Sequence, residues 1–254
     1  MRGQSPRNLY GRRREATPSS QIRAGPAVLI TSLDNEKLKL VRKLHDRSWR
    51  DKLGLFVAEG EDLVQSAVDA GVEPVELLLA GENVEPTLLA EVSTLGHPPR
   101  VVGIFRRSAL PTELPAVGLA LWHVGDPGNV GTLIRSADAF GPAFVAPSSG
   151  SADPTGPKAL RASAGSLFRV PLVGFDRAPG ERIALVPRGG QPLAEIELGP
   201  TVLFVLGAER EGLPGEVLAQ CERQATIPLE SGVESLNVAM AGTIALYELR
   251  RRGG

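Results

Sequence analysis

The sequence of 254 residues contains one cysteine, Cys221, and only three histidines. A single cysteine cannot form an internal disulfide, and scattered histidines cannot supply the spaced ligand sets of zinc sites. No apolar run approaches the roughly 20 residues that a helix needs to cross a bilayer. We therefore expect a cytoplasmic protein without a membrane segment and without a bound metal.

Aromatic residues make up only 4% of the chain, and its formal net charge is −1. A platform of stacked aromatic rings for nucleic acid would therefore be thin. The protein is not basic overall, so any RNA binding must use local basic patches. Its hydrophobic content of 42% is typical of a globular protein.

The first 30 residues show no sustained periodicity and are rich in Arg, Ser, Pro and Gly. We interpret 1–30 as a flexible basic arm. Six arginines against a single acid, Glu15, leave three alternatives open. The arm is a plain disordered tail, a segment that contacts RNA phosphates, or an organelle transit peptide.

Strands alternate with helices along the rest of the chain, which predicts an α/β protein. The connector from Leu110 to Pro115 carries prolines that block regular structure, so we place a domain boundary there. We assign 31–115 to a smaller first domain and 116–254 to a second. The pattern predicts first-domain helices at 34–49, 62–70 and 86–95, with strands at 55–58, 75–80 and 101–105. It predicts second-domain strands at 119–124, 143–147, 170–173, 183–187, 202–206 and 225–229, with helices at 130–140, 157–164, 214–221 and 236–250.

Three segments of the second domain, 126–137, 203–213 and 227–242, combine polar residues with glycine-bearing turns. Each turn lies beside a predicted strand or helix start, which is where open α/β sheets bind ligands. The glycines permit close approach of the backbone to a ligand. The polar residues that stand out are Asn129, Arg135, Glu209, Ser235 and Asn237.

Each of these residues also has an ordinary structural interpretation. Asn129 or Ser235 could cap a helix, and Glu209 could be a solvated loop acid. Arg135 could form a surface pair with Asp138, three residues along the helix. The chain lacks Gly-x-Gly-x-x-Gly, Walker and Gly-x-Ser-x-Gly motifs, which disfavours dinucleotide binding, nucleoside triphosphate binding and an α/β-hydrolase site.

Taken together, in this order and spacing, the three segments resemble the motifs of SpoU-type RNA ribose 2′-O-methyltransferases of the SPOUT superfamily. The resemblance implies a parallel-sheet α/β domain with a deep trefoil knot, which transfers a methyl group from S-adenosylmethionine to a ribose 2′-hydroxyl. It implies catalytic roles for Asn129, Arg135, Glu209, Ser235 and Asn237. It implies cofactor contacts by Leu206, Gly207, Ile227, Pro228 and Leu236.

The resemblance also implies a homodimer whose interface includes the last helix. We expect the apolar residues of that helix to form a buried face, and they are Val238, Ala241, Ile244, Ala245 and Leu249. Proposals for the family make Arg135 the base. Because a guanidinium keeps its proton in proteins, we expect Arg135 to orient and stabilise instead, with Asn129 orienting Arg135.

The first domain resembles the L30e-like RNA substrate-binding domain of larger family members, through residues 35–44 and 56–60. This resemblance implies phosphate contacts by Lys37, Lys39, Arg42, Lys43 and Arg47. The alternative is an ordinary solvated helix face. Segment 161–167 also matches a family segment beside the cofactor site, and we expect Arg161 to contact an RNA phosphate.

The two-domain layout favours ribosomal RNA as the substrate, with transfer RNA second. Two other classes of function stay open. One is a non-catalytic RNA-binding protein with a degenerate methyltransferase domain. The other is an unrelated α/β enzyme that acts on a small metabolite.

Overall fold

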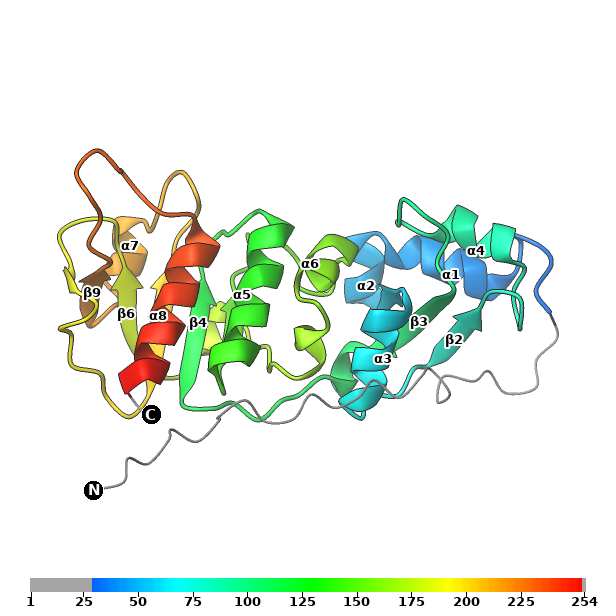
Figure 1. Cartoon of the computed structure of the whole chain (residues 1–254), viewed down its shortest axis with the longest axis horizontal. Helices are drawn as coiled ribbons and strands as arrows, with labels where there is room; N and C mark the ends of the chain where they lie inside the picture. Colours follow the sequence, from blue (N-terminus) through cyan, green and yellow to red (C-terminus); the bar gives the residue numbers. More distant parts are fainter. Residues whose placement is uncertain (1–28, 253–254) are drawn as a thin grey trace, which may run out of the picture.

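The computed structural model describes residues 29–252, which form two α/β units side by side along the long axis of the molecule (Figure 1). The arm expected at 1–30 lies almost wholly outside the described residues. The strands of the first unit are β1 (Leu55–Glu59), β2 (Glu76–Leu79) and β3 (Val101–Arg106), and its helices are α1 (Glu36–Leu44), α2 (Arg47–Leu53), α3 (Glu61–Asp69) and α4 (Pro86–Val92), with a short 3-10 turn at Arg107–Ala109.

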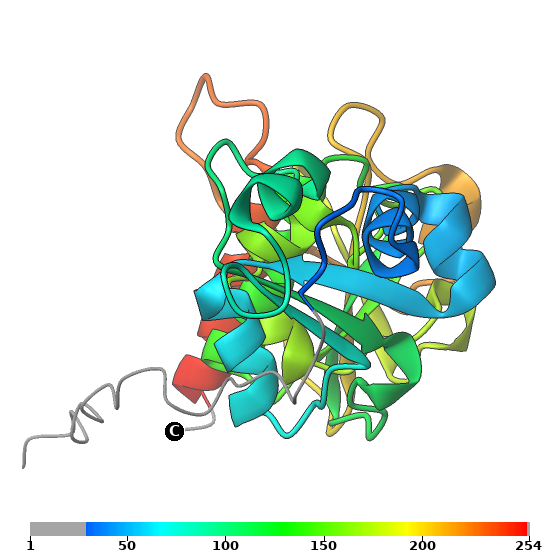
Figure 2. The same cartoon turned by 90° about the vertical axis from the view of Figure 1, so that its right-hand side faces the viewer.

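The first unit is built on a three-stranded antiparallel sheet of order β1-β3-β2. Successive strand residues point to opposite faces of the sheet. Val57 and Ile104 therefore pack with α1 and α4, while Phe56 and Phe105 lie on the face that carries α3. Figure 2 shows this unit end-on, with α1 and α2 (blue) on one side of the strands and α3 (cyan) on the other.

The single helix expected at 34–49 is two helices, so that prediction was wrong. Asp46 adopts an extended backbone and its carboxylate accepts a hydrogen bond from the Ser48 N–H, which starts α2. Aspartate favours such capping positions over helix interiors because its side chain bonds the neighbouring backbone.

The second unit contains a six-stranded sheet of order β5-β4-β8-β6-β9-β7, in which every pairing is parallel. Its strands are β4 (Val117–Leu121), β5 (Phe144–Pro147), β6 (Glu181–Leu185), β7 (Gln191–Pro192), β8 (Val202–Leu206) and β9 (Arg223–Thr226). Its helices are α5 (Pro127–Phe140), α6 (Pro157–Ala162), α7 (Gly215–Leu218) and α8 (Val238–Arg252), with 3-10 turns at Ser166–Phe168 and Phe175–Arg177. The strand predicted at 170–173 was wrong, because this apolar run forms only an isolated bridge between Leu172 and Val145.

Helices α5 and α8 pack side by side on one face of this sheet (Figure 1). A Cβ atom at Gly242 would clash with the Leu133 side chain, so glycine permits the close approach of the two helices. The Ser136 and Thr243 hydroxyls join the helices through a 2.6 Å hydrogen bond. The second turn of α8 is thereby fixed beside the second and third turns of α5.

The two units share one hydrophobic core. Phe56 and Phe105 of the first sheet contact Phe168 of the second unit, with ring centroids 6.0 and 5.4 Å from that of Phe168. All three rings are fully buried. The connector at 110–115 therefore does not separate two independent cores.

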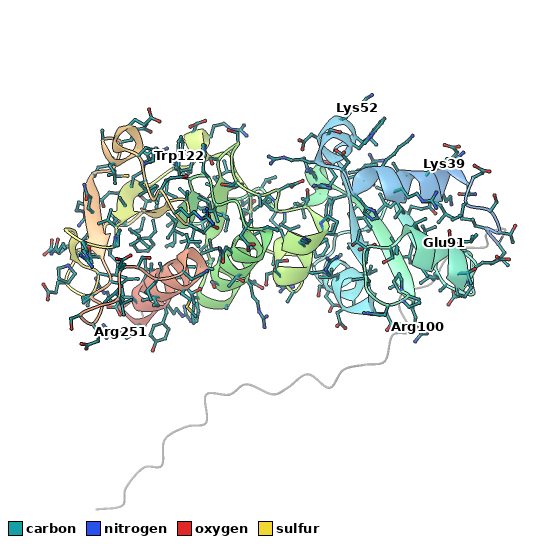
Figure 3. All side chains as sticks on the ribbon, turned by 90° about the horizontal axis from the view of Figure 1, so that it is seen from above. Lys39, Lys52, Glu91, Arg100, Trp122 and Arg251 are labelled. Carbon is teal, nitrogen blue, oxygen red and sulfur yellow. The ribbon has the colours of Figure 1, made fainter. Side chains whose placement is uncertain are left out.

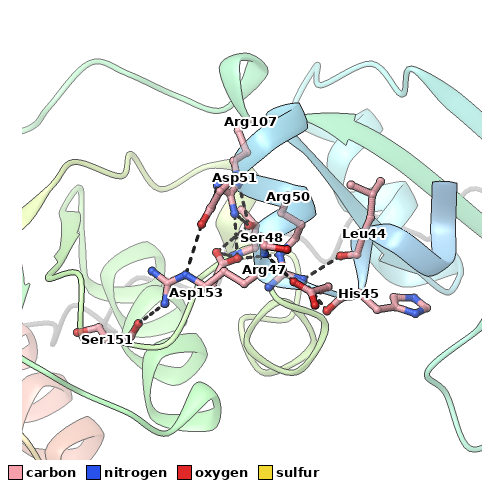
Figure 4. A network of polar contacts seen from close by, with 11 residues as sticks. Leu44, His45, Arg47, Ser48, Arg50, Asp51, Arg107, Ser151 and Asp153 are labelled. Atoms are coloured by element: carbon pink, nitrogen blue, oxygen red, sulfur yellow. Dashed lines mark hydrogen bonds and ion pairs between the residues drawn. The ribbon is translucent and has the colours of Figure 1, made fainter.

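Buried charge also crosses the junction (Figure 4). Arg50 is 4% exposed, and its Nε donates to Asp153 at 2.7 Å. Arg107 donates to the same carboxylate oxygen at 2.8 Å and to the Thr155 hydroxyl. Burial acts to raise the pKa of Asp153, but the Thr155 hydrogen bonds and the Arg107 and Arg50 guanidiniums outweigh it and lower that pKa.

We expect Phe168→Ala to destabilise both units, because it removes a ring from the shared core. Loss of a buried phenyl ring costs about 3–5 kcal/mol of the free energy of unfolding. Urea unfolding followed by circular dichroism measures this loss, and hydrogen exchange reports on β1 and β3 directly. Phe175→Ala is the matched control, since Phe175 is buried wholly within the second unit. Unchanged exchange of β1 and β3 in the Phe168 variant would contradict a shared core.

Candidate active site

A cavity of about 340 Å³ opens at the carboxyl ends of β6, β8 and β9. These strands run parallel, so the loops that follow them gather at one edge of the sheet (Figure 1). Both apolar and polar side chains line the cavity. The apolar side chains are Leu185, Leu206, Ile227, Leu229, Leu236, Val238 and Ala241, and the polar ones are Glu209, Arg210, Ser235 and Asn237.

Four of the five predicted cofactor contacts line this cavity, and they are Leu206, Gly207, Ile227 and Leu236. Pro228 does not line it. The wall is completed at the end of β6 by Leu185, Val186 and Pro187, which were not predicted to contact the cofactor. An apolar strand at 183–187 was expected, but only the strand order places its end beside β8.

The loop after β8 is a closed turn. The Ala208 N–H donates to the Gly212 carbonyl at 3.1 Å, and the Gly212 N–H donates back to Ala208 at 3.0 Å. A Cβ atom at Gly207 would clash with the Gly212 backbone, and Gly212 has a φ of +67°. Both glycines are therefore required by the turn that holds Glu209 at the cavity rim.

Three of the predicted polar residues form one directed chain of hydrogen bonds. Asn129 Nδ2 donates to Glu209 Oε1 at 2.9 Å, and Asn237 Nδ2 donates to Asn129 Oδ1 at 3.1 Å. Because a carboxylate only accepts, the Glu209 end fixes which way both amides point. These hydrogen bonds join the segments that follow β4, β8 and β9.

Asn237, and not Ser235, caps the last helix. Its Oδ1 accepts from the backbone N–H groups of Ala239 and Met240, at 2.9 and 3.3 Å. The cap of α5 is likewise Asp126, whose carboxylate accepts from the Asn129 N–H at 2.9 Å. The Asn129 side chain is thereby left to bond Glu209, and Ser235 lies exposed on the cavity wall.

Glu209 stays ionised at neutral pH. Burial acts to raise the pKa of its carboxyl, but hydrogen bonds from Asn129 and from backbone N–H groups, including that of Asp126, lower the pKa below its ordinary value. An acid of this kind is a poor general base near neutrality. Its geometry instead suits an orienting acceptor.

Arg135 lies apart from the hydrogen bonds that join Glu209, Asn129 and Asn237. It is exposed on α5 and does not line the cavity. Asn129 contacts Glu209 and Asn237, so the expectation that Asn129 orients Arg135 was wrong. Asp138 pairs with Arg169 at 2.6 Å, which also leaves the alternative of an Arg135–Asp138 surface pair without support.

The expected RNA-binding cations have been partly neutralised within the protein. Lys37 pairs with Glu76 at 2.6 Å, and Lys39 pairs with Glu36 and Asp34. Arg47 donates to the Ser151 carbonyl at the unit junction, and Arg161 donates to Thr94 and pairs with Glu59. Among the cations expected to bind RNA, only Arg42 and Lys43 are exposed without an ion pair to another described residue.

Between residues 29 and 252, no helix is long and apolar enough to span a membrane. In the same range, no group of three or more His, Cys, Asp or Glu side chains is placed to hold a metal ion.

The sheet is parallel, and a cavity with converging polar side chains lies at its carboxyl edge. This arrangement is typical of α/β enzymes that bind their ligands at the carboxyl ends of the strands. Residues 116–247 match the SpoU rRNA methylase family, and residues 35–103 match the MRM3-like substrate-binding domain. The chain belongs to the SpoU rRNA methylase family.

Similar proteins agree with this assignment over most of the chain. A tRNA/rRNA methyltransferase of Synechocystis is 33% identical, over 88% of this chain and 93% of its own. The 23S rRNA (guanosine(2553)-2′-O)-methyltransferase RlmP of Bacillus subtilis is 31% identical, over 87% and 98%. The crystal structure of an AdoMet-bound rRNA methyltransferase of Sinorhizobium meliloti has a TM-score of 0.79 at 30% identity, covering 90% of this chain and 99% of its own.

We expect Asn129→Asp to lower the free energy of unfolding at pH 7 by about 1–3 kcal/mol, because a second carboxylate would then face Glu209. Two carboxylates at this distance share one proton, so one pKa rises and the penalty shrinks as the pH falls through it. Urea unfolding at pH 7 and pH 4.5 measures both values. Asn35→Asp is the matched control, because Asn35 caps α1 and aspartate caps a helix equally well. An equal loss at the two pH values would exclude charge repulsion as the cause.

Proposed function

We propose that this protein transfers a methyl group from S-adenosylmethionine to a ribose 2′-hydroxyl of RNA. The observation that carries the proposal is the hydrogen-bonded chain of Glu209, Asn129 and Asn237 at the rim of the sheet-edge cavity. Three separate segments of the sequence supply these side chains. Their meeting beside one apolar cavity favours catalysis over the non-catalytic RNA-binding alternative.

The cavity suits S-adenosylmethionine chemically. Its apolar walls at the ends of β6 and β8 fit an adenosine moiety, and the strand-end backbone offers hydrogen-bonding groups beside it. When bound, the cofactor supplies the methyl group as a sulfonium electrophile. Leu206, Gly207, Ile227 and Leu236 are the proposed contacts, and Pro228 shapes the turn between them.

The polar chain is proposed to position the RNA ribose. Holding a nucleophile in line with its target contributes roughly 7–11 kcal/mol in favourable systems. The ionised Glu209 fixes Asn129, and Asn129 fixes Asn237 against the first turn of α8. Ser235 is proposed to contact the ribose from the cavity wall. Arg135, exposed on α5, is proposed to orient RNA phosphates and not to act as the base.

Ribosomal RNA is the proposed substrate, with transfer RNA second, and this choice is supported by the 2′-O-methylation of 23S rRNA named for the Bacillus relative. We propose that the activity is cytoplasmic. Residues 31–115 are proposed as the substrate domain and 116–254 as the catalytic domain. Because the units share a core, point variants test the substrate domain better than its deletion does.

Calorimetry with S-adenosylmethionine, followed by methyl-transfer assays on ribosomal and transfer RNA, tests the function. We expect binding of the cofactor and transfer to RNA, and no transfer to a substrate whose target ribose is 2′-deoxy. Arg135→Ala should reduce transfer while leaving cofactor affinity unchanged, because Arg135 lies outside the cavity. Normal turnover of this variant would remove Arg135 from the mechanism. Absence of cofactor binding by the intact chain would remove the proposed function.

We further propose that the catalytic domain contains a trefoil knot. The strand order supports it, because β9 lies beyond β6 while α8 returns to pack on α5 and β8.

We also propose a homodimer formed through α8. Of the residues expected on a buried face of this helix, Val238 and Ala245 are buried within the single chain and Ile244 is 38% exposed. Met240 and Tyr247 are 61% and 52% exposed. With Ile244 they form an apolar face at helical spacing, which a second copy of the chain would cover.

We expect Ile244→Glu to convert the dimer to a monomer, since it places a charge in this apolar face. Sedimentation velocity measures the change. Leu114→Glu serves as the control, because Leu114 is similarly exposed, at 36%, on the connector between the units. A wild-type monomer, or a variant that still sediments as a dimer, would exclude α8 as the interface.

A further inference from the structure

One aromatic ring of the first unit lies at the surface between two lysines. Trp49 of α2 is half-buried, and the Nζ atoms of Lys43 and Lys52 lie 5.0 and 4.8 Å from its ring centroid. Phe56, Phe105, Phe144, Phe168 and Phe204 are instead fully buried. Trp49 therefore differs from these rings, because its indole lies at the surface between two cations.

The two lysines lack a carboxylate partner among residues 29–252. The nearest acids in the sequence are committed elsewhere, because Asp46 caps α2 and Asp51 pairs with Arg107 and Arg47. The contact of each ammonium group with the indole is worth about 0.5–1 kcal/mol at an exposed site. A phosphate would compete well for such weakly held cations.

The position of this site is fixed relative to the catalytic edge. Arg50, which follows Trp49, bonds Asp153, and Arg47 bonds the Ser151 carbonyl of the same loop. The Ser151 hydroxyl in turn donates to Leu121 at the end of β4 and accepts from the Val124 N–H. Figure 3 shows Lys52 and Trp122, which follows β4, along the same long side of the molecule, with Arg100 and Arg251 along the opposite side.

We propose that Trp49, Lys43 and Lys52 form a contact site for single-stranded RNA, in which an unpaired base stacks on the indole and the lysines bind the flanking phosphates. This inference rests on the proposed function for its RNA ligand. It changes the RNA-binding surface expected from the sequence. Trp49 and Lys52 are added to that surface. Lys37, Lys39 and Arg47 are removed from it, because they bond other groups of the protein. The rigid link to β4 then selects substrates with an unpaired base at a fixed distance from the target ribose.

Binding of the full chain to a fluorescent single-stranded RNA oligonucleotide, and to a hairpin duplex of the same length, tests the site. Stacking of a base on an aromatic ring is worth about 1–3 kcal/mol, so we expect Trp49→Ala to weaken single-strand binding roughly 5- to 150-fold. Trp49→Phe keeps a ring and should recover most of the affinity. Duplex binding should change little, because paired bases cannot stack on the indole.

The lysines are tested by salt dependence. Each phosphate contact on a single strand contributes roughly 0.7 to the slope of log affinity against log salt. We expect Lys43→Ala and Lys52→Ala each to reduce the slope by about this amount. Arg100→Ala is the control, because Arg100 pairs with Glu61 on the opposite side of the same unit.

Several outcomes would overturn the inference. They are unchanged single-strand affinity in Trp49→Ala, equal losses for single strand and duplex, or slopes that match that of Arg100→Ala. Circular dichroism melting shows whether each variant is folded. If Trp49→Ala does not fold, the affinity of Trp49→Phe for the single strand still tests the site. Cofactor affinity by calorimetry should be normal in every variant. An intact chain that binds RNA at this site but not S-adenosylmethionine would remove the proposed function and leave the site.

Discussion

The active edge of this protein depends on the parallel pairing of β4 with β8. Parallel neighbours end at the same edge, so the residues that follow Leu121 and Leu206 begin side by side. Asn129 and Glu209 then meet although 79 residues separate them in the chain. The chain must next pass β6 to form β9, and the segment between β9 and α8 then brings Asn237 back to Asn129. The polar chain is therefore a product of topology, and the local sequence supplies only the correct amide or carboxyl group at each loop.

Much of this arrangement was predictable from the sequence. The strand at 202–206, the glycine turn after it and the polar helix start at 235–237 have local signatures that the structure follows. The contribution of Leu185 to Pro187 was not predictable, because nothing in that run indicates which strand lies beside it. The run at 170–173 misled for a related reason, since apolar residues can be buried without joining a sheet.

Charge placement was the least predictable property of the site. Lys37 and Arg47 belong to the same basic segment of the sequence. In the structure, however, Lys37 pairs with an acid of β2 and Arg47 donates to a loop carbonyl of the second unit. Whether a cation is available to RNA depends on which acid or carbonyl the fold brings to it. Periodicity shows that a helix face is basic but not that its charges are unpaired. Because the net charge is only −1, we expect a polyanion to bind where unpaired cations are clustered.

The shared phenylalanine core has a consequence for how such proteins diversify. Phe168 closes the same hydrophobic cluster that Phe56 and Phe105 begin, so either unit alone would expose an apolar surface made for its neighbour. Recombination at the connector would replace the first unit with a domain that does not cover the apolar surface around Phe168. Changes of RNA target are therefore more accessible through substitutions on the outer helices than through exchange of the whole first unit.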